Sequence, residues 1–242
     1  MKPTIAAFRP DDERLADAVA LLDSLGAEPV PDPMLAVEPT GAVPRDDADY
    51  VVLTSKTGVE LAADAGWVSD GAIVCAIGDA TAARLREAGY PVDLVPEEFS
   101  SSGLVRALRG GVDGARVEVA RSDHGSAVLL DGLADAGAYV HETVLYELTR
   151  PAGSGESAEL AAAGELDAAL FTSSLTVANF LDAAAERGVR DAAVAGLNDA
   201  VVGCIGNPTA ETAESEGIAI DVVPDEATFE ALARAVVARF ER

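Results

Sequence analysis

The sequence contains few lysines, few cysteines and no long apolar run. Lys2 and Lys56 are the only lysines, so every other fixed positive charge is an arginine. The longest apolar stretches are far shorter than the roughly 20 residues that a membrane-spanning helix needs. Residues 1–5 also lack the apolar core of an export signal. We therefore expect a cytoplasmic protein that does not contact membranes.

The chain has two cysteines, Cys75 and Cys204, and each lies inside an apolar segment. Neither has a second cysteine or a histidine at the spacing of metal ligands. These features predict buried thiols in a reducing compartment and no metal site. The motifs of serine hydrolases, zinc enzymes, P-loop proteins and dinucleotide-binding proteins are also missing.

Negative charge dominates the composition. Asp and Glu total 42 against 17 Lys and Arg, which gives a formal net charge of −25. Such a surface repels nucleic acids and anionic membranes, so neither is an expected partner. The acidic residues are spread along the chain rather than gathered in a tail. This distribution indicates a solvation device of a salt-loving organism, and the alternative is an acidic surface that serves a cationic ligand.

An internal repeat organises the sequence. Three motifs each occur twice along the chain. The first is an apolar segment that ends in Thr-Ser, and the second is the pattern Ile-Gly-x-x-Thr-Ala. The third is Gly-x-x-x-Asp-x-Val-Pro, which precedes a helical pattern. Repeats of a strand followed by a helix predict an α/β fold with parallel sheets flanked by helices. In chain order, the paired segments are 50–55 with 168–173, 77–82 with 205–210, and 89–96 with 217–224, followed by helices expected at 102–108 and 228–240.

A second, weaker pair of units spans residues 5–39 and 117–151. The four units therefore alternate along the chain, and two foldings are possible. Either each weak unit joins the strong unit that follows it, or the first unit joins the last and the chain leaves one domain and returns to it. In the second case the extended segments 31–39 and 144–151, which both end in proline, would form a two-stranded hinge.

Four turns lead from the carboxyl end of an expected strand to the N-terminus of an expected helix. Ligands of open α/β sheets bind at such positions, where free backbone N–H groups attract anions. The alternative for any one turn is an ordinary helix cap formed by Ser, Thr or Asp. The four turns are Thr54-Ser55, Gly78-Asp79, Thr172-Ser173 and Gly206-Asn207.

Together these motifs resemble the uroporphyrinogen-III synthase family over nearly the whole chain. The resemblance rests on the order of the two Thr-Ser turns, the Ile205–Ala210 turn and the strand 145–151 with its Tyr146. It implies two similar parallel-sheet α/β domains, the first of them discontinuous. We expect domain one at 1–35 plus 152–242, domain two at 40–147, and hinge strands near 36–39 and 148–151.

The resemblance also implies an activity. Members of this family close linear hydroxymethylbilane to uroporphyrinogen III, with loss of water and inversion of the last pyrrole ring, on the route to haem, sirohaem and cobalamin. It implies a cyclising lyase that needs no cofactor and whose main task is to position a flexible polycarboxylate. We expect a monomer that receives its substrate from hydroxymethylbilane synthase.

Three residues are candidates for catalysis. A phenol can donate a proton at neutral pH, so Tyr146 is the candidate general acid for the departing hydroxyl, and packing at the hinge is its alternative role. Thr81 and Thr209 occupy matching repeat positions, and the resemblance places them near the substrate; helix capping is their alternative role. The expected substrate-binding residues are Arg9, Thr54, Ser55, Lys56, Gly78, Arg121, Ser122, Thr172, Ser173, Ser174, Ile205, Gly206 and Asn207.

The family often has an Arg-Gly-rich turn after the strand that begins near residue 117, and this chain departs from it. The arginine is present as Arg121, but Asp123 adds negative charge where a polyanion would lie. Two other functions remain open from the residues. A non-catalytic two-lobed binding module for a small polyanion would use the same turns. A tandem receiver-like regulator is disfavoured, because the strand ends carry Thr-Ser and Ile-Gly instead of an acidic phosphoacceptor pocket.

The charge excess predicts that the fold depends on salt. At ~1 M salt the Debye length is roughly 3 Å, so repulsion between surface carboxylates is largely screened. The free energy of unfolding should therefore rise steadily as KCl increases from ~0.1 to ~1 M, as urea titrations would measure. A protein that is fully folded and active in low-salt buffer would contradict this prediction.

Overall fold

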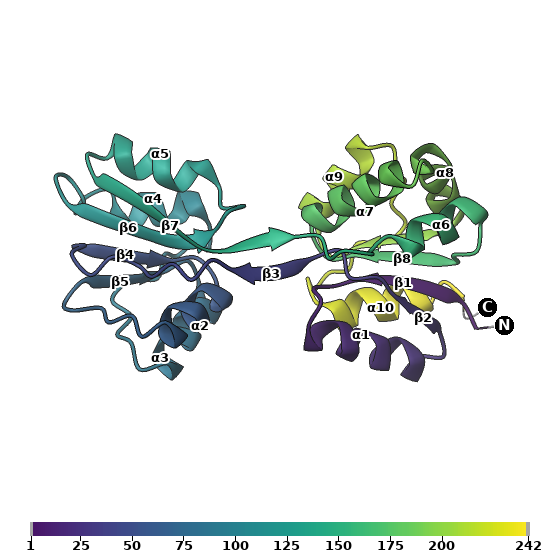
Figure 1. Ribbon diagram of the computed structural model, residues 1–242, viewed down its shortest axis with the longest axis horizontal. Helices are drawn as coiled ribbons and strands as arrows, with labels where there is room; N and C mark the ends of the chain where they lie inside the picture. The colour runs from purple at the N-terminus through teal and green to yellow at the C-terminus, as the bar shows by residue number, and fades with distance from the viewer. Residues whose placement is uncertain (1, 241–242) are drawn as a thin grey trace. The chain divides into compact units, whose positions relative to one another are not determined.

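The computed structural model describes residues 2–240, and its internal contacts divide the chain into two units. Unit one comprises Met1–Val37 and Thr149–Arg242, and unit two comprises Glu38–Leu148. In each unit a parallel sheet carries helices on both faces (Figure 1). The described residues include no helix that is long and apolar enough to cross a bilayer.

Unit one is built on a four-stranded sheet of order β2-β1-β8-β9. Its strands are β1 Thr4–Phe8, β2 Glu28–Pro31, β8 Ala168–Phe171 and β9 Val201–Cys204. One face packs on α1 Glu13–Ser24 and α10 Phe229–Val237. The other face packs on α6 Glu156–Ala163, α7 Ser174–Glu186, α8 Arg190–Asp199 and α9 Asn207–Ser215. The rings of Phe8, Phe171 and Phe180 form the centre of this second layer, with centroids 4.5–5.7 Å apart.

Unit two is built on a five-stranded sheet of order β3-β7-β6-β4-β5. Its strands are β3 Ala36–Pro39, β4 Tyr50–Leu53, β5 Ile73–Ala76, β6 Arg116–Ser122 and β7 Tyr139–Thr149. The helices are α2 Lys56–Asp64 and α3 Asp79–Glu87 on one face, and α4 Ser101–Leu108 and α5 Ala127–Asp135 on the other (Figure 1). Both chain connections between the units pass through β3 and β7. Strand β7 ends at Thr149, so residues 150 and 151, assigned to the hinge strand from sequence, lie beyond it.

The two units share one topology and one register. In unit one Ile5 of β1 pairs with Ala168 of β8, and in unit two Val117 of β6 pairs with Tyr50 of β4. The alignment of 168 with 50 is the one that the Thr-Ser repeat indicates, and it makes β1 and β2 equivalent to β6 and β7. The predicted α/β fold with parallel sheets is therefore confirmed.

The repeat also conserves four carboxylates that accept backbone hydrogen bonds. In one pair the aspartate directly precedes a central strand and accepts from the N–H of the first residue of the neighbouring strand. In the other pair it accepts from the N–H of the second residue of the edge strand β5 or β9. These bonds join the ends of different segments and so hold the strands in register. The bonds are Asp49 with Arg116 N and Asp167 with Thr4 N, and Asp93 with Val74 N and Asp221 with Val202 N, all 2.8–2.9 Å long.

A buried carboxylate in unit one joins two distant parts of the chain. Asp32 directly follows β2 and is only 3% exposed. Its carboxylate accepts hydrogen bonds from Gly155 N at 2.8 Å and from Ser157 N at 2.9 Å, and also from the Ser157 hydroxyl. These donors belong to the first turn of α6, whose cap residue Gly155 has no side chain of its own to accept them. Asp32 therefore caps α6 from outside the helix.

Replacing Asp32 should destabilise unit one. Asp32→Ala removes the acceptor of three buried donors, so we expect the free energy of unfolding to fall by about 2–3 kcal/mol. Urea unfolding followed by circular dichroism in high salt would measure the change. The control Asp17→Ala removes an exposed carboxylate from α1 and should stay within about 0.5 kcal/mol of the parent. Equal effects of the two variants would contradict the capping role.

Candidate functional site

Each sheet carries two turns side by side at the edge formed by the carboxyl ends of its strands, which we call the carboxyl edge. In unit two, Thr54-Ser55 follows β4 and Gly78 precedes α3 next to it. In unit one, Thr172-Ser173 follows β8 and Gly206 precedes α9. All four predicted turns thus lead from a strand into a helix N-terminus, and within each unit the two helix starts are neighbours.

The two serines of these turns are helix caps. Ser55 Oγ accepts a hydrogen bond from Gly58 N at 2.9 Å. Ser173 Oγ accepts one from Thr176 N at 3.2 Å and takes part in a capping box with Thr176. Thr172 is also engaged, since its hydroxyl donates to Phe8 O at 2.7 Å. The capping alternative is therefore confirmed for both serines, and their contact with a substrate stays a prediction.

The other two helix starts have no side-chain cap. Gly78 and Gly206 occupy the cap positions of α3 and α9, and no side chain accepts from the first N–H groups there. Thr81 and Thr209 are the third residues of these helices, and each is only 4% exposed. The interpretation of the two threonines as caps is wrong, because glycine holds the cap position. The uncapped N–H groups make the start of α3 better suited to an anion than the starts after the serines. The start of α9 offers fewer N–H groups, because Pro208 has none and Thr209 N donates to Gly206 O at 3.1 Å.

Tyr146 is joined to the Thr-Ser turn of unit two. It lies on β7, is 6% exposed, and its hydroxyl donates to Ser55 Oγ at 3.0 Å. A register shift between Arg121 and Ser122 lets Ser122 pair with Tyr146. The phenol therefore lies at the carboxyl edge. Its hydrogen bond to Ser55 sets its orientation, and Ser55 is itself fixed by its hydrogen bond to the first turn of α2. This contact joins residues that are 91 positions apart in the sequence.

The two predicted arginines occupy equivalent positions but have different surroundings. Each follows the residue at which its strand stops pairing with β8 or β4, since Phe8 pairs with Phe171 and Ala120 pairs with Leu53. The Arg9 guanidinium lies over the Phe229 ring, 5.1 Å from its centroid. Its Nε is buried and has no hydrogen-bond partner among the described residues. Burial, with a smaller contribution from Arg14, lowers the pKa of Arg9.

Arg121 is instead paired within unit two. It is 4% exposed, and its Nε donates to Glu142 Oε1 at 2.6 Å while Nη1 donates to Ser126 O at 2.5 Å. Gly125 packs so closely on this side chain that a Cβ there would overlap it. A substrate carboxylate would have to displace Glu142 from Arg121. Contact between Arg121 and the substrate therefore stays a prediction, and Glu142 competes for the same guanidinium. Lys56 is exposed at the first position of α2.

One residue at this edge escaped the sequence analysis. Phe99 is 58% exposed, and its ring lies against Gly78, where a Cβ would be 3.1 Å from the ring carbon Cγ. The repeat places Ala227 at the matching position of unit one. An exposed aromatic ring beside an uncapped helix start can cover an apolar ligand surface. Its sequence signal is a phenylalanine in a polar turn, three residues after the Val-Pro that ends the repeat.

The thiols take no part in this site. Cys75 and Cys204 are buried and unpaired, and burial raises the pKa of each to about 12. Such thiols are poor nucleophiles at neutral pH. Within residues 2–240, no group of three or more His, Cys, Asp or Glu side chains is arranged to hold a metal ion.

Comparison with known proteins gives consistent results. A family model described as uroporphyrinogen-III synthase HemD matches residues 16–234. A protein of Methanothermobacter thermautotrophicus, provisionally named as a uroporphyrinogen-III synthase, is 34% identical over 230 residues, which cover 88% of this chain and 90% of that protein.

Solved structures of two bacterial proteins have the same fold. A mutant uroporphyrinogen III synthase of Thermus thermophilus aligns with a TM-score of 0.71 at 19% identity, over 100% of this chain and 99% of the other. The uroporphyrinogen-III synthetase of Helicobacter pylori aligns with a TM-score of 0.64 at 15% identity, over 100% of both chains. At these identities the likeness concerns the fold alone.

Proposed function

This chain belongs to the uroporphyrinogen-III synthase family, and from that membership we propose that it closes hydroxymethylbilane to uroporphyrinogen III. The observation that carries the proposal is the match of the family model over residues 16–234, which include all four carboxyl-edge turns. The last pyrrole ring is inverted in this reaction, and the terminal hydroxyl leaves as water.

This ring closure needs a protein that holds the substrate in one conformation and donates one proton to the departing oxygen. The C–O bond of the hydroxymethyl group breaks as its oxygen accepts a proton. Because the last ring is turned end for end, one existing C–C bond to that ring breaks and two C–C bonds to it form, and the pyrrole carbon that makes the final bond loses a proton. No electrons are transferred, so the balance needs no redox partner. Holding a flexible chain in the one conformation that leads to inversion is a large part of such catalysis.

Uncapped helix starts and Arg9 support binding of the substrate carboxylates. Each helix N-terminus stabilises an anion by about 0.3–1 kcal/mol. Among the described residues no side chain competes as an acceptor at the starts after Gly78 and Gly206, and the start after Gly78 offers more N–H groups because Pro208 has none. Arg9 adds a buried Nε that lacks a partner among the described residues. In a chain with a net charge of −25, backbone N–H groups bind a polyanion without additional cations. We include Thr54, Ser122, Ser174 and Ile205 as further contacts along these edges.

We assign Tyr146 as the general acid for the departing hydroxyl. Its hydroxyl donates to Ser55 Oγ at 3.0 Å. This bond fixes the orientation of the phenol before the substrate binds, as a positioned proton donor requires. Thr81 and Thr209 are assigned to the substrate-facing ends of α3 and α9. Their equivalent burial in both units supports a shared role.

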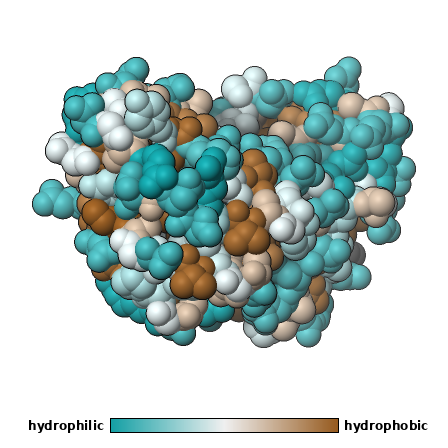
Figure 2. Space-filling model, turned by 60° about the vertical axis from the view of Figure 1, so that its left-hand side comes forward, coloured by the Kyte–Doolittle hydropathy of each residue, from teal (hydrophilic) through white to brown (hydrophobic). Residues whose placement is uncertain are grey.

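The setting of the enzyme is also part of the proposal. We propose a cytoplasmic monomer from a salt-adapted organism, supplied directly by hydroxymethylbilane synthase because free hydroxymethylbilane closes by itself to the uninverted isomer. The excess of 42 acidic over 17 basic residues supports adaptation to salt, and the face drawn in Figure 2 mixes hydrophilic residues with smaller hydrophobic patches. The buried, unpaired thiols support a reducing compartment.

The product isomer tests the function. Purified protein is coupled in high salt to an enzyme that generates hydroxymethylbilane, and the oxidised porphyrins are separated. We expect the type III isomer to dominate, whereas the same mixture without the protein yields type I. Folded protein that yields type I alone, while still binding a tetrapyrrole carboxylate, would replace this function with the non-catalytic binding module.

Removing the phenol oxygen of Tyr146 tests its role. Tyr146→Phe should lower kcat for type III formation by roughly 10²-fold, because a positioned general acid contributes about 10²–10⁴-fold. The matched control is Tyr50→Phe, which removes a phenol that donates to Gly111 O at the opposite edge of the same sheet. The control should retain the parent rate. Equal rates for both variants would show that Tyr146 only packs β7.

A further inference from the structure

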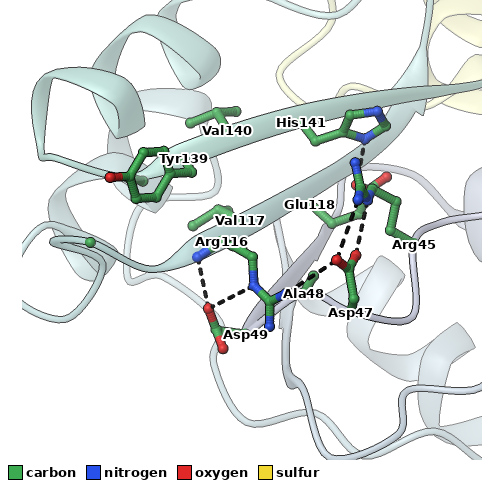
Figure 3. Close-up of a pocket in the computed structure, with 12 residues that line it drawn as sticks. Arg45, Asp47, Ala48, Asp49, Arg116, Val117, Glu118, Tyr139, Val140 and His141 are labelled. Atoms are coloured by element: carbon green, nitrogen blue, oxygen red, sulfur yellow. Dashed lines mark hydrogen bonds and ion pairs between the residues drawn. The ribbon is translucent and has the colours of Figure 1, made fainter.

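One cavity lies away from the proposed active site. It has a volume of about 700 Å³ and lies wholly within unit two. Its lining includes Arg116 and Tyr139, the first residues of β6 and β7, so it opens at the amino ends of these strands (Figure 3). The catalytic candidates of unit two lie at the carboxyl ends. We call this space the amino-edge cavity.

A buried carboxylate without a full set of partners lines the amino-edge cavity. The Glu118 side chain is 0% exposed. Its Oε2 is 2.7 Å from His141 Nδ1, while Oε1 is buried and has no hydrogen-bond partner among the described residues. Leaving a buried carboxylate oxygen without a donor is costly, so natural proteins rarely do so unless another group supplies the donor.

The fold itself does not require this carboxylate. Glu118 pairs with His141 between β6 and β7, and the shared register makes Ala6 and Val30 of β1 and β2 their equivalents. Ala6 is fully buried in the core of unit one, and Val30 packs against the same core. The same sheet position therefore accepts apolar residues in one unit and carries an acid–imidazole pair in the other.

The cavity occupies a place that helices cover in unit one. There, α6 and α8 supply Ala158 and Leu197 to the cluster that contains Ala6. In unit two the segments that correspond to α6 and α8 are residues 40–49 and 66–72, and neither contains a helix. Arg45 and Asp47 of the first segment line the cavity instead. The space thus lies where unit two has no counterpart of α6 and α8 next to α2 and α3.

The charges around the cavity leave one carboxylate in excess. Arg45 contacts Asp47 at 2.9 Å, and Arg116 contacts Asp47 at 3.1 Å and Asp49 at 3.6 Å. Two arginines and two aspartates thereby balance. Glu118 makes no ion pair with an arginine among the described residues, and it contributes only after Asp47 to raising the pKa of Arg45. A cation or strong donor is the group that complements Glu118.

An aromatic ring in the lining favours an organic cation. Tyr139 is 71% exposed and lies in the lining of the cavity (Figure 3), two residues before His141 on the same strand and therefore on the same face of the sheet. An aromatic face attracts cations as well as apolar groups. The described residues offer no cluster of ligands for a metal ion.

We propose that the amino-edge cavity is a second ligand site, which binds a small organic cation with a primary ammonium group. The ammonium donates to Glu118 Oε1, and the apolar body of the ligand lies against Tyr139. This site is independent of the proposed reaction, since it needs neither the carboxyl edge nor a tetrapyrrole.

The two histidines of the chain provide a direct test. Benzylammonium chloride is titrated into the protein at fixed pH and fixed ionic strength, and the imidazole C–H signals are followed by NMR. His141 borders Glu118, whereas His124 pairs with Asp123 at the other edge of the sheet and serves as an internal control. We expect a saturable shift of the His141 signal with the His124 signal unchanged. The neutral isostere benzyl alcohol should cause much less shift.

Variants separate the site from general attraction to an acidic surface. Glu118→Gln keeps the shape and should weaken benzylammonium binding by about tenfold or more, because a charge-assisted hydrogen bond is lost. Asp131→Asn removes an exposed carboxylate from α5 and should leave binding unchanged. Tyr139→Ala, at an exposed position, should also weaken binding and covers the case in which Glu118→Gln does not fold. Equal shifts of both histidines, equal binding of the alcohol, or undiminished binding by a folded Glu118→Gln would overturn the proposal.

Discussion

Parallel hydrogen bonding in a shared register, β1 to β8 and β6 to β4, is the constraint on which the rest of this structure depends. Because successive parallel strands point the same way, every strand-to-helix turn of a unit falls on one edge. The register then decides which side chains meet there. It aligns Arg9 with Arg121 and the Thr-Ser turns with each other. Four aspartates that accept backbone N–H groups hold the strand ends in this register.

A shortage of cations shapes the proposed site. Fifteen of the 17 basic residues are arginines, because Lys2 and Lys56 are the only lysines. Most arginines of the described chain contact a carboxylate of the same unit, as Arg121 does with Glu142. A polyanionic substrate must therefore be held mainly by groups that carry no formal charge. The start of α3 with its glycine cap provides them, since a cap side chain takes none of its first N–H groups among the described residues. The start of α9 contributes fewer, because Pro208 has no N–H.

The two units have diverged where the repeat does not constrain them. Unit one covers one face of β1 and β2 with α6 and α8, and the core there is apolar around Ala6. Unit two has no counterpart of α6 and α8 among residues 40–49 and 66–72, and its sheet carries Glu118 and His141 there. A buried charge is stable only with a partner or an accessible donor. The same topology can thus bury a core in one copy and form a polar cavity in the other.

The sequence by itself determined the parallel α/β repeat, the four strand-to-helix turns and the acidic surface, because these features follow from local apolar patterns, turn residues and composition. It also indicated the serine caps, which act within three residues of their donors. Only the tertiary structure decided which distant side chains meet: Tyr146 with Ser55, Glu118 with His141, and Asp32 with α6. It also showed that glycines, not Thr81 and Thr209, hold the cap positions. Such contacts depend on strand order and register, which bring together residues 23 to 125 positions apart and leave no periodic signal in the sequence.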